Sequence, residues 1–564
     1  MKFAEFPYER PDLTAAMAQL DELSHAIRQA KTAKEAKTAF LSFEKITEQI
    51  GSMSSICYVR HTVDTRDPFY EAENTFWDEN LPLLMDKQLD IYRAMLASGC
   101  REELEKDLGK LLFDKMEIEV KSADPSIIPL MQEENRLQTE YQRLYASAQI
   151  PFQGKTLTVA QLTPYKQDRD RKVRKAAFEA EGRFFDENRE KFDEIYDKLV
   201  QNRTEQAKLM GYENFIPLGY IRMKRNGYGI PEVKAYRQKI VEELVPAVCE
   251  LKKVQQQRIG ADSLQFFDDT FLFPDGNPVP FGSSDEILAA GQQMYRALSP
   301  ETAEFIDFMF DSQLFDVLAK EGKAPGGYCT YIPSQKSPFI FSNFNGTAGD
   351  VDVLTHEAGH AFAAYQAAKQ NLLPEYADNT LEACEVHSMS MEFLTSDYHH
   401  LFFADATDKY QLFHAESAVF FLPYGCMVDE FQHIVYENPQ LTPEQRNSAW
   451  MELEKKYRPY LEFGDLPFYG RGAGWQRQMH IYLNPFYYID YCLAQTVALQ
   501  FWALYLKDPK NAWSRYLTLV NQAGTGTFVD VVKAAGLKTP FEDGCIKEVA
   551  ESSKNWCLAH QPQK

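Results

Sequence analysis

The chain of 564 residues has no apolar run of the roughly 18 uncharged residues that a membrane-spanning helix needs. It begins with MKFAEFP, which lacks the apolar stretch of a secretory signal peptide. Its nine cysteines are odd in number and contain no CxxC pair, a usage typical of a reducing compartment rather than of a disulfide framework. We therefore expect a cytoplasmic protein with no membrane partner.

Basic residues are fewer than acidic ones. Lys and Arg number 60 against 82 Asp and Glu, so the formal net charge is −22. An acidic surface repels nucleic acid and anionic membranes, which argues against either as a partner. No internal repeat is visible, and 45% hydrophobic with 25% charged residues is ordinary for a soluble globular protein.

One motif carries clear chemistry. Residues 356–360 read His-Glu-Ala-Gly-His, the HExxH pattern. Positions four apart on an α-helix are separated by about 40°, so His356 and His360 can bind one metal ion. Glu357 projects to the side, where its carboxylate can accept a proton from water at the open position of a catalytic zinc. The motif predicts a zinc peptidase.

The segment around the motif reads as a helix. Asp350 can cap its N-terminus, apolar residues recur at helical spacing after it, and nothing breaks the run before Asn371. Directly upstream, residues 328–332 and 339–344 read as two strands joined by a turn with two prolines. A strand beside a zinc site can pair with an extended peptide, although a purely structural hairpin explains the pattern equally well.

Most of the remaining chain has a helical pattern. Residues 13–208 read as helices with charged outer faces, interrupted by a short hairpin at 150–159 whose turn holds Gly154. We divide the chain into an N-terminal helical region, 1–210, and a catalytic region, 211–564.

Two histidines leave a zinc ion short of a third protein ligand. The next helical segment, TLEACEVHSMSMEFL, offers Glu382, Glu385 and Glu392, which can share one helix face because they lie three and seven residues apart. Spacing does not choose among them. Glu375 lies in the preceding loop, where it is held less rigidly, and His387 points away from the shared face.

A second group of polar residues lies far downstream, in YGRGAGWQRQMHIYLNPFYYIDY. His480 follows a loop with three glycines, and Asn484 and Pro485 read as the cap and first residue of a helix that carries Tyr488 and Tyr491 one turn apart. An imidazole and a phenol near zinc can donate hydrogen bonds to the oxyanion that forms at a peptide carbonyl. Tyrosines in an aromatic helix are more often structural, so the pattern leaves both roles open.

These segments resemble the thimet oligopeptidase and oligoendopeptidase F family of zinc peptidases, most closely its bacterial Pz-peptidase-like members. The resemblance rests on HEAGHAF at 356–362, CEVHSMSME at 384–392 and HIYLNPFYYIDY at 480–491. It implies a mainly α-helical fold in two halves that enclose a deep channel, with a small β-sheet beside the HExxH helix. Such a channel admits short unfolded peptides and excludes folded proteins.

The resemblance also implies roles for individual residues. The family's glutamate ligand matches Glu385, which with His356 and His360 would hold one zinc ion per chain. A second family glutamate, seven residues later, matches Glu392 and would orient a zinc histidine. The family's histidine before a tyrosine-rich helix matches His480, and its transition-state tyrosines match Tyr488 and Tyr491. Tyr487 is a neighbouring candidate.

We therefore expect a zinc-dependent oligoendopeptidase that hydrolyses internal bonds of short peptides, with Glu357 as general base. Two alternatives remain: a helical metallocarboxypeptidase or aminopeptidase, and a non-catalytic peptide-binding protein. Hydrolysis of peptides blocked at both ends distinguishes the first alternative, and turnover by the zinc-loaded protein distinguishes the second.

Overall fold

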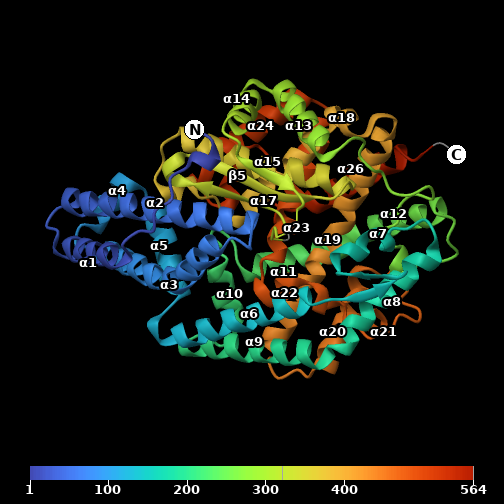
Figure 1. Ribbon diagram of the computed structural model, residues 1–564, viewed down its shortest axis with the longest axis horizontal. Helices are drawn as coiled ribbons and strands as arrows, with labels where there is room; N and C mark the ends of the chain where they lie inside the picture. Colours follow the sequence, from blue (N-terminus) through green and yellow to red (C-terminus); the bar gives the residue numbers. More distant parts are fainter. Residues whose placement is uncertain (321, 325, 563–564) are drawn as a thin grey trace. The chain divides into compact units, whose positions relative to one another are not determined.

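Helices dominate the computed structural model, which describes residues 1–320, 322–324 and 326–562 (Figure 1). The chain divides into two units, each assembled from three separate stretches of sequence. Unit 1 comprises Met1–Lys121, Val279–Thr407 and Leu504–Leu537. Unit 2 comprises Ser122–Pro278, Asp408–Ala503 and the C-terminal segment from Lys538.

Unit 1 holds the N-terminal helices, a three-stranded sheet and the predicted HExxH helix. Its helices are α1 (Leu13–Gln29), α2 (Ala33–Val63), α3 (Pro68–Leu96), α4 (Arg101–Leu108), α5 (Lys110–Ser122), α13 (Ser284–Leu298), α14 (Pro300–Asp311), α15 (Ala348–Lys369), α16 (Pro374–Ala377), α17 (Leu381–Leu394), α18 (His400–Phe403), α24 (Pro509–Gln522) and α25 (Phe528–Ala534). Its strands are β3 (Phe315–Leu318), β4 (Tyr328–Ile332) and β5 (Ser337–Phe344).

The sheet of unit 1 has the order β3-β5-β4, with β5 parallel to β3 and antiparallel to β4. β5 is buried along nearly its whole length, as a central strand of apolar residues should be. It packs against α15, which in turn packs against α17 (Figure 1). The two predicted strands are confirmed. β3 is not predicted from the sequence, because its four residues include Asp316 and give no clear strand pattern.

The start of α15 differs from the prediction. The helix begins at Ala348 with Thr347 at its N-cap, so Asp350 is not the cap. The Asp350 carboxylate instead accepts hydrogen bonds from the backbone amides of Asn345, at 2.8 Å, and Gly346, at 2.6 Å. These bonds hold the loop between β5 and α15, and they fix the position of the helix relative to the sheet.

The described residues of unit 2 form helices and one two-stranded hairpin, joined by loops. Its helices are α6 (Ile128–Ala146), α7 (Thr163–Lys166), α8 (Arg171–Glu187), α9 (Arg189–Leu209), α10 (Phe215–Arg222), α11 (Ile230–Lys239), α12 (Val245–Arg258), α19 (Thr407–Glu437), α20 (Pro443–Tyr457), α21 (Pro467–Gly470), α22 (Met479–Leu483), α23 (Tyr488–Tyr505) and α26 (Cys545–Ala559). The predicted hairpin is confirmed as β1 (Ile150–Phe152) and β2 (Lys155–Leu157). Gln153 and Gly154 both take positive φ at its turn, as a two-residue type I′ loop requires.

The expected mainly α-helical fold with a small sheet beside the HExxH helix is confirmed. Within the described part of the chain, no helix combines the length and the apolar character required to cross a bilayer.

Two carboxyl groups share a buried position near the segment that joins α15 to α17. Glu44 on α2 is only 7% exposed, and burial together with the charge of Glu375 on α16 raises its pKa to about 10. The Tyr92 hydroxyl donates a hydrogen bond of 2.9 Å to Glu375. Glu44 is therefore protonated at neutral pH.

We predict that Glu44→Gln stabilises the protein at alkaline pH. Folded Glu44 keeps a proton that the unfolded chain loses near pH 4.3, so this group makes stability fall as pH rises from there to about 10. The neutral amide removes that dependence. The free energy of unfolding of the variant, relative to that of the wild type, should rise from pH 6 to pH 9 by up to about 1.4 kcal/mol per pH unit. Melting temperatures measured across this range should show a difference that grows with pH.

Glu22→Gln, the same change at an exposed position of α1, is the matched control. A margin that stays constant with pH, or that Glu22→Gln reproduces, would contradict the burial of a protonated Glu44.

Candidate metal centre and active site

Helices α15 and α17 of unit 1 bring three of the predicted ligands together. His356 and His360 lie one turn apart on α15, with ring centroids separated by 4.9 Å. Glu385 on α17 places its Oε2 atom 3.3 Å from His356 Nε2 and 3.7 Å from His360 Nε2. The three donor atoms all lie within 4.8 Å of one another.

These separations fit a tetrahedral zinc site. Zinc–ligand distances of about 2.0–2.2 Å place two ligands of a tetrahedron about 3.3–3.6 Å apart. Two imidazoles and a carboxylate also leave a fourth position for water, as in catalytic sites. No second group of three such donors occurs in the part of the chain that the structure describes.

A second glutamate of α17 holds one of the histidines in place. Glu392 Oε1 lies 2.7 Å from His356 Nδ1. A carboxylate accepts hydrogen bonds, so Nδ1 carries a proton, and Nε2, the ring atom on the Glu385 side, is the one that would bind a metal ion. The contact fits the orienting role that the sequence resemblance implies for Glu392.

Gly359 allows the two helices to approach this closely. A Cβ atom at this position would lie 2.6 Å from Ser388 Cα and 2.7 Å from the carbonyl oxygen of His387, both on α17. Carbon atoms in contact are normally about 3.5–4.0 Å apart. Any side chain at residue 359 would therefore move α17, and with it Glu385, away from the histidines.

Glu357 lies next to this group in a nearly dry setting. It is 8% exposed, and burial raises its pKa to about 7. The charge of His356 lowers this pKa and the charge of Glu385 raises it. A carboxylate with a pKa near neutrality can both accept and release a proton under working conditions. Glu357 therefore has the electrostatic setting of a general base.

The two histidines respond differently to their surroundings. Burial lowers the pKa of His360 to about 4, although Glu385 acts upward, and the neutral imidazole is the form that binds metal. Burial also acts downward at His356, but hydrogen bonds with Glu385 and Glu392 outweigh it and hold the pKa well above its usual value. A metal ion bound at His356 Nε2 would therefore displace the proton that Glu385 favours on this atom.

The other candidates of this region lie outside the group of three donors. Glu382 is buried on α17 and Glu375 lies beside Glu44. His387 is 1% exposed, and burial lowers its pKa to about 3. Its backbone carbonyl accepts a hydrogen bond from the Tyr516 hydroxyl at 2.9 Å, so α24 contacts α17 here.

Unit 2 brings the second set of predicted residues together. The His480 ring lies 5.1 Å from the Tyr488 ring and 5.8 Å from the Tyr491 ring, centroid to centroid. The Tyr487 ring lies 4.9 Å from that of Tyr491. The helix that carries these tyrosines begins at Tyr488 rather than near Asn484 as expected.

The later start of α23 has a local cause. Asn484 closes the preceding helix α22, and Phe486 takes a positive φ of 69°, which no α-helix contains. The Phe486 amide donates to Gln432 at 2.9 Å, which holds this bend.

A glutamine that the sequence prediction did not include orients His480. Gln478 Nε2 lies 2.8 Å from His480 Nδ1, and the Tyr424 hydroxyl donates to Gln478 Oε1 at 2.9 Å. Tyr424 thereby turns the amide nitrogen toward the imidazole, so Nδ1 accepts and the neutral ring carries its proton on Nε2. The position of Gln478 two residues before His480 is a sequence feature that could have indicated this contact. The contribution of Tyr424 could not be predicted in this way, because Tyr424 is distant in sequence.

Comparison with known proteins agrees with this geometry. The model of the Peptidase M3 N-terminal domain matches residues 3–123, and the model of Peptidase family M3 matches residues 164–273 and 303–551. The chain belongs to peptidase family M3. The metal-ligand group on α15 and α17 and the cluster around His480 both lie within the residues of this M3 peptidase that match the family model.

Individual relatives cover nearly the whole M3 chain. A structure of Pz peptidase A with an inhibitor is 46% identical, covers 99% of both chains and superposes with a TM-score of 0.94. Oligopeptidase PepF of Bacillus subtilis is 24% identical over 89% of this chain and 78% of its own length. An oligoendopeptidase F homolog of Borreliella burgdorferi is 23% identical over 72% of this chain and 71% of its own. The expected family is confirmed, and the chain is an M3 metallopeptidase.

We predict that Gly359→Ala damages the metal centre. Alanine normally stabilises a helix interior by up to about 1 kcal/mol relative to glycine, but here its methyl group would separate α15 from α17. We expect a loss of about 1–3 kcal/mol in stability and a fall in zinc affinity of about 10- to 100-fold, measured by competition with a chelator.

Gly51→Ala on α2 is the matched control, because no atom outside the neighbouring backbone of its own helix lies within 4 Å of the added Cβ. It should raise stability slightly and leave zinc affinity unchanged. If Gly359→Ala behaves like this control, the close approach of the two helices does not position Glu385.

Proposed function

We propose that this M3 peptidase is a zinc-dependent oligoendopeptidase that hydrolyses internal bonds of short unfolded peptides. The observation that carries the proposal is the group of His356, His360 and Glu385 at zinc-ligand spacing, with buried Glu357 beside it. The names of the relatives support oligopeptides as substrates. The absence of a disulfide pattern in the sequence supports a cytoplasmic site of action.

In the proposed mechanism His356, His360 and Glu385 would hold one zinc ion per chain. When bound, the ion would polarise the scissile carbonyl and lower the pKa of a water molecule to about 7. Glu357 accepts the proton of that water as it attacks, and then passes the proton to the leaving amine. Glu392 keeps His356 oriented throughout, because its bond to Nδ1 does not involve the reacting atoms.

We propose that His480, Tyr488 and Tyr491 donate hydrogen bonds to the oxyanion of the tetrahedral intermediate. The Nε2–H tautomer that Gln478 favours gives His480 a suitable donor, and the two phenols are donors by nature. Their mutual ring contacts keep these side chains in one cluster. In this scheme residues 1–210 supply part of the wall of a substrate channel and residues 211–564 supply the chemistry.

The edge of the sheet in unit 1 offers a place for the peptide backbone. Ile340 donates its amide to Leu314 on the β3 side, so its antiparallel partner Cys329 turns its own amide and carbonyl away from β5. Tyr331, which pairs with Pro338, faces outward in the same way. An extended peptide can pair with these two residues through main-chain bonds, which make little demand on side-chain identity.

We predict that Glu357→Gln retains zinc and loses activity. The amide cannot accept the proton of water, and general acid–base catalysis contributes about 10²- to 10⁴-fold in rate. The measurements are zinc content per chain and hydrolysis of internally quenched peptides blocked at both ends. Near-normal hydrolysis by the zinc-loaded variant would refute this role, and cleavage by the wild type of unblocked peptides alone would indicate an exopeptidase.

We predict that Tyr488→Phe and Tyr491→Phe each lower kcat with little change in KM or zinc content. Loss of one oxyanion donor costs about 10²- to 10³-fold in kcat. Tyr212→Phe, a tyrosine of unit 2 outside the cluster, is the matched control and should leave kcat unchanged. Equal effects of all three substitutions, or an effect confined to KM, would argue against oxyanion stabilisation.

A further inference from the structure

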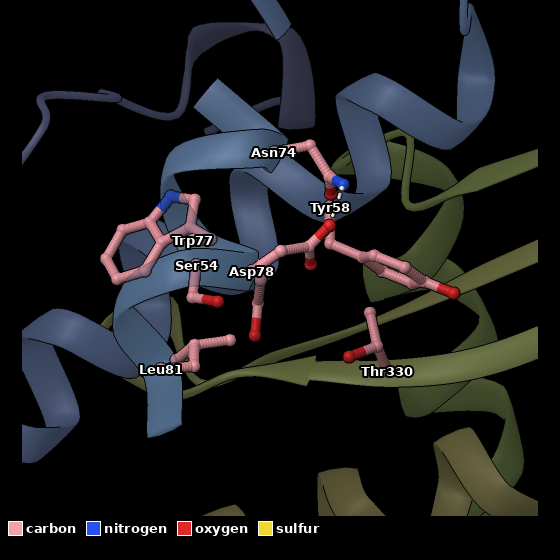
Figure 2. Close-up of a pocket in the computed structure, with 8 residues that line it drawn as sticks. Ser54, Tyr58, Asn74, Trp77, Asp78, Leu81 and Thr330 are labelled. Atoms are coloured by element: carbon pink, nitrogen blue, oxygen red, sulfur yellow. Dashed lines mark hydrogen bonds between the residues drawn. The ribbon is translucent and has the colours of Figure 1, made fainter. Parts of the chain in front are cut away.

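A small cavity lies between helices α2 and α3 and the edge strand β4. Its volume is about 180 Å³, close to that of one side chain. Figure 2 shows Asp78, Tyr58 and Thr330 around the same space. The lining comes from all three elements: Ser54, Ser55, Tyr58, Asn74, Trp77, Asp78, Leu81 and Thr330.

The cavity lies on the opposite face of β4 from the metal helix. Burial and the charge of Glu357 raise the pKa of the Cys329 thiol, which places that side chain on the α15 side of the sheet. The Tyr328 hydroxyl bonds to Thr62 of α2 at 2.6 Å, which places Tyr328 on the α2 side. Side chains alternate along a strand, so Thr330 shares the α2 side with Tyr328.

The pairing register then determines which substrate residue meets the cavity. Cys329 and Tyr331 direct their main-chain groups outward, and Thr330 lies between them. A peptide strand bonded to those two residues has one residue directly opposite Thr330. Its side chain lies on the same face as that of Thr330, at the short separation of a non-hydrogen-bonded pair.

We propose that this cavity is a substrate subsite for a lysine or arginine side chain, with Asp78 as its carboxylate. The inference rests on the endopeptidase function proposed above and names a side-chain preference for it. A cationic side chain opposite Thr330 enters the cavity, lays its aliphatic stem along the apolar wall and places its charge at Asp78.

The chemistry of the lining favours a cation. Trp77, Tyr58 and Leu81 provide aromatic and aliphatic surface for the stem of a long side chain. Asp78 Oδ2 accepts a hydrogen bond from Asn74 Nδ2 at 3.1 Å, which orients the carboxylate. None of the lining residues is basic. Partial burial raises the pKa of Asp78 despite the opposing effect of His61, and a bound cation offsets this cost.

The position of the subsite along the peptide follows from the strand. A Cβ atom on Gly327 would lie 3.8 Å from Glu357 Oε1, so this end of β4 is next to the proposed base. Thr330 is three residues further on, which corresponds to about 10 Å of extended chain. The preferred basic residue therefore lies about three residues from the scissile bond.

The test uses quenched peptides blocked at both ends, in which each position near the cleavage site carries Lys or, for comparison, Gln. The zinc-loaded wild type should show kcat/KM about 10-fold higher for Lys at one position about three residues from the scissile bond. Asp78→Asn should reduce this Lys/Gln ratio below about 2-fold and leave hydrolysis of the all-Gln peptide within about 2-fold of wild type. Asp78→Lys should reverse the preference toward Glu at that position.

Glu79→Gln is the matched control, because it removes the same charge from an exposed neighbouring position on α3 that does not line the cavity. An unchanged Lys/Gln ratio in Asp78→Asn, an equal loss in Glu79→Gln, or equal slowing of every peptide would overturn the subsite.

Failure of the proposed function has a different signature. In that case the zinc-loaded wild type cleaves no blocked peptide, whereas binding of the Lys and Gln peptides to Glu357→Gln, followed by fluorescence polarisation, still reports the preference. Loss of that binding preference in the double variant Glu357→Gln/Asp78→Asn supports the subsite, and its persistence overturns it.

Discussion

The close approach of α15 and α17 at Gly359 is the constraint on which the metal centre depends. The methyl group of even an alanine at this position would overlap the backbone of α17 at His387 and Ser388. The same contact brings Glu385 within 3.3 Å of His356 Nε2. Packing of the α15 backbone against the α17 backbone therefore positions the third ligand, Glu385. The glycine within the HExxH motif makes this packing possible because it has no side chain.

The charges of the site indicate why a cation belongs there. Glu357, Glu385 and Glu392 surround His356 in a mostly buried region, where like charges repel and unpaired carboxylates are costly. The raised pKa of His356 shows how strongly these carboxylates attract positive charge. A divalent ion would balance the negative charge of these carboxylates more fully than a single proton does. Glu357 would then remain free to accept and release a proton. The Asp350 carboxylate accepts hydrogen bonds from the loop after β5, which ties the helix that carries this base to the central strand of the sheet.

Much of the site could be predicted from local sequence because its geometry is local. The spacing of His356 and His360 fixes them on one helix face, and strands β4 and β5 have a β-branched and aromatic composition. The choice among three glutamates on α17 depends on how that helix packs, which spacing does not encode. Spacing also gives no access to neighbours that are distant in sequence: the Tyr424 hydroxyl bonds to Gln478 across 54 residues, and Asp78 and Thr330 line one cavity although they lie on different elements. Short segments were misjudged where single residues decide them, as with the bend at Phe486.

Zinc K-edge X-ray absorption on the purified protein reports directly which atoms hold the metal ion. We predict one zinc ion per chain with two imidazole nitrogens and one carboxylate oxygen at about 2.0–2.2 Å, together with one further light atom from water. We also predict that His360→Ala loses one imidazole contribution. A spectrum with sulfur at about 2.3 Å, or one that is unchanged in His360→Ala, would show instead that zinc binds elsewhere than at His356, His360 and Glu385.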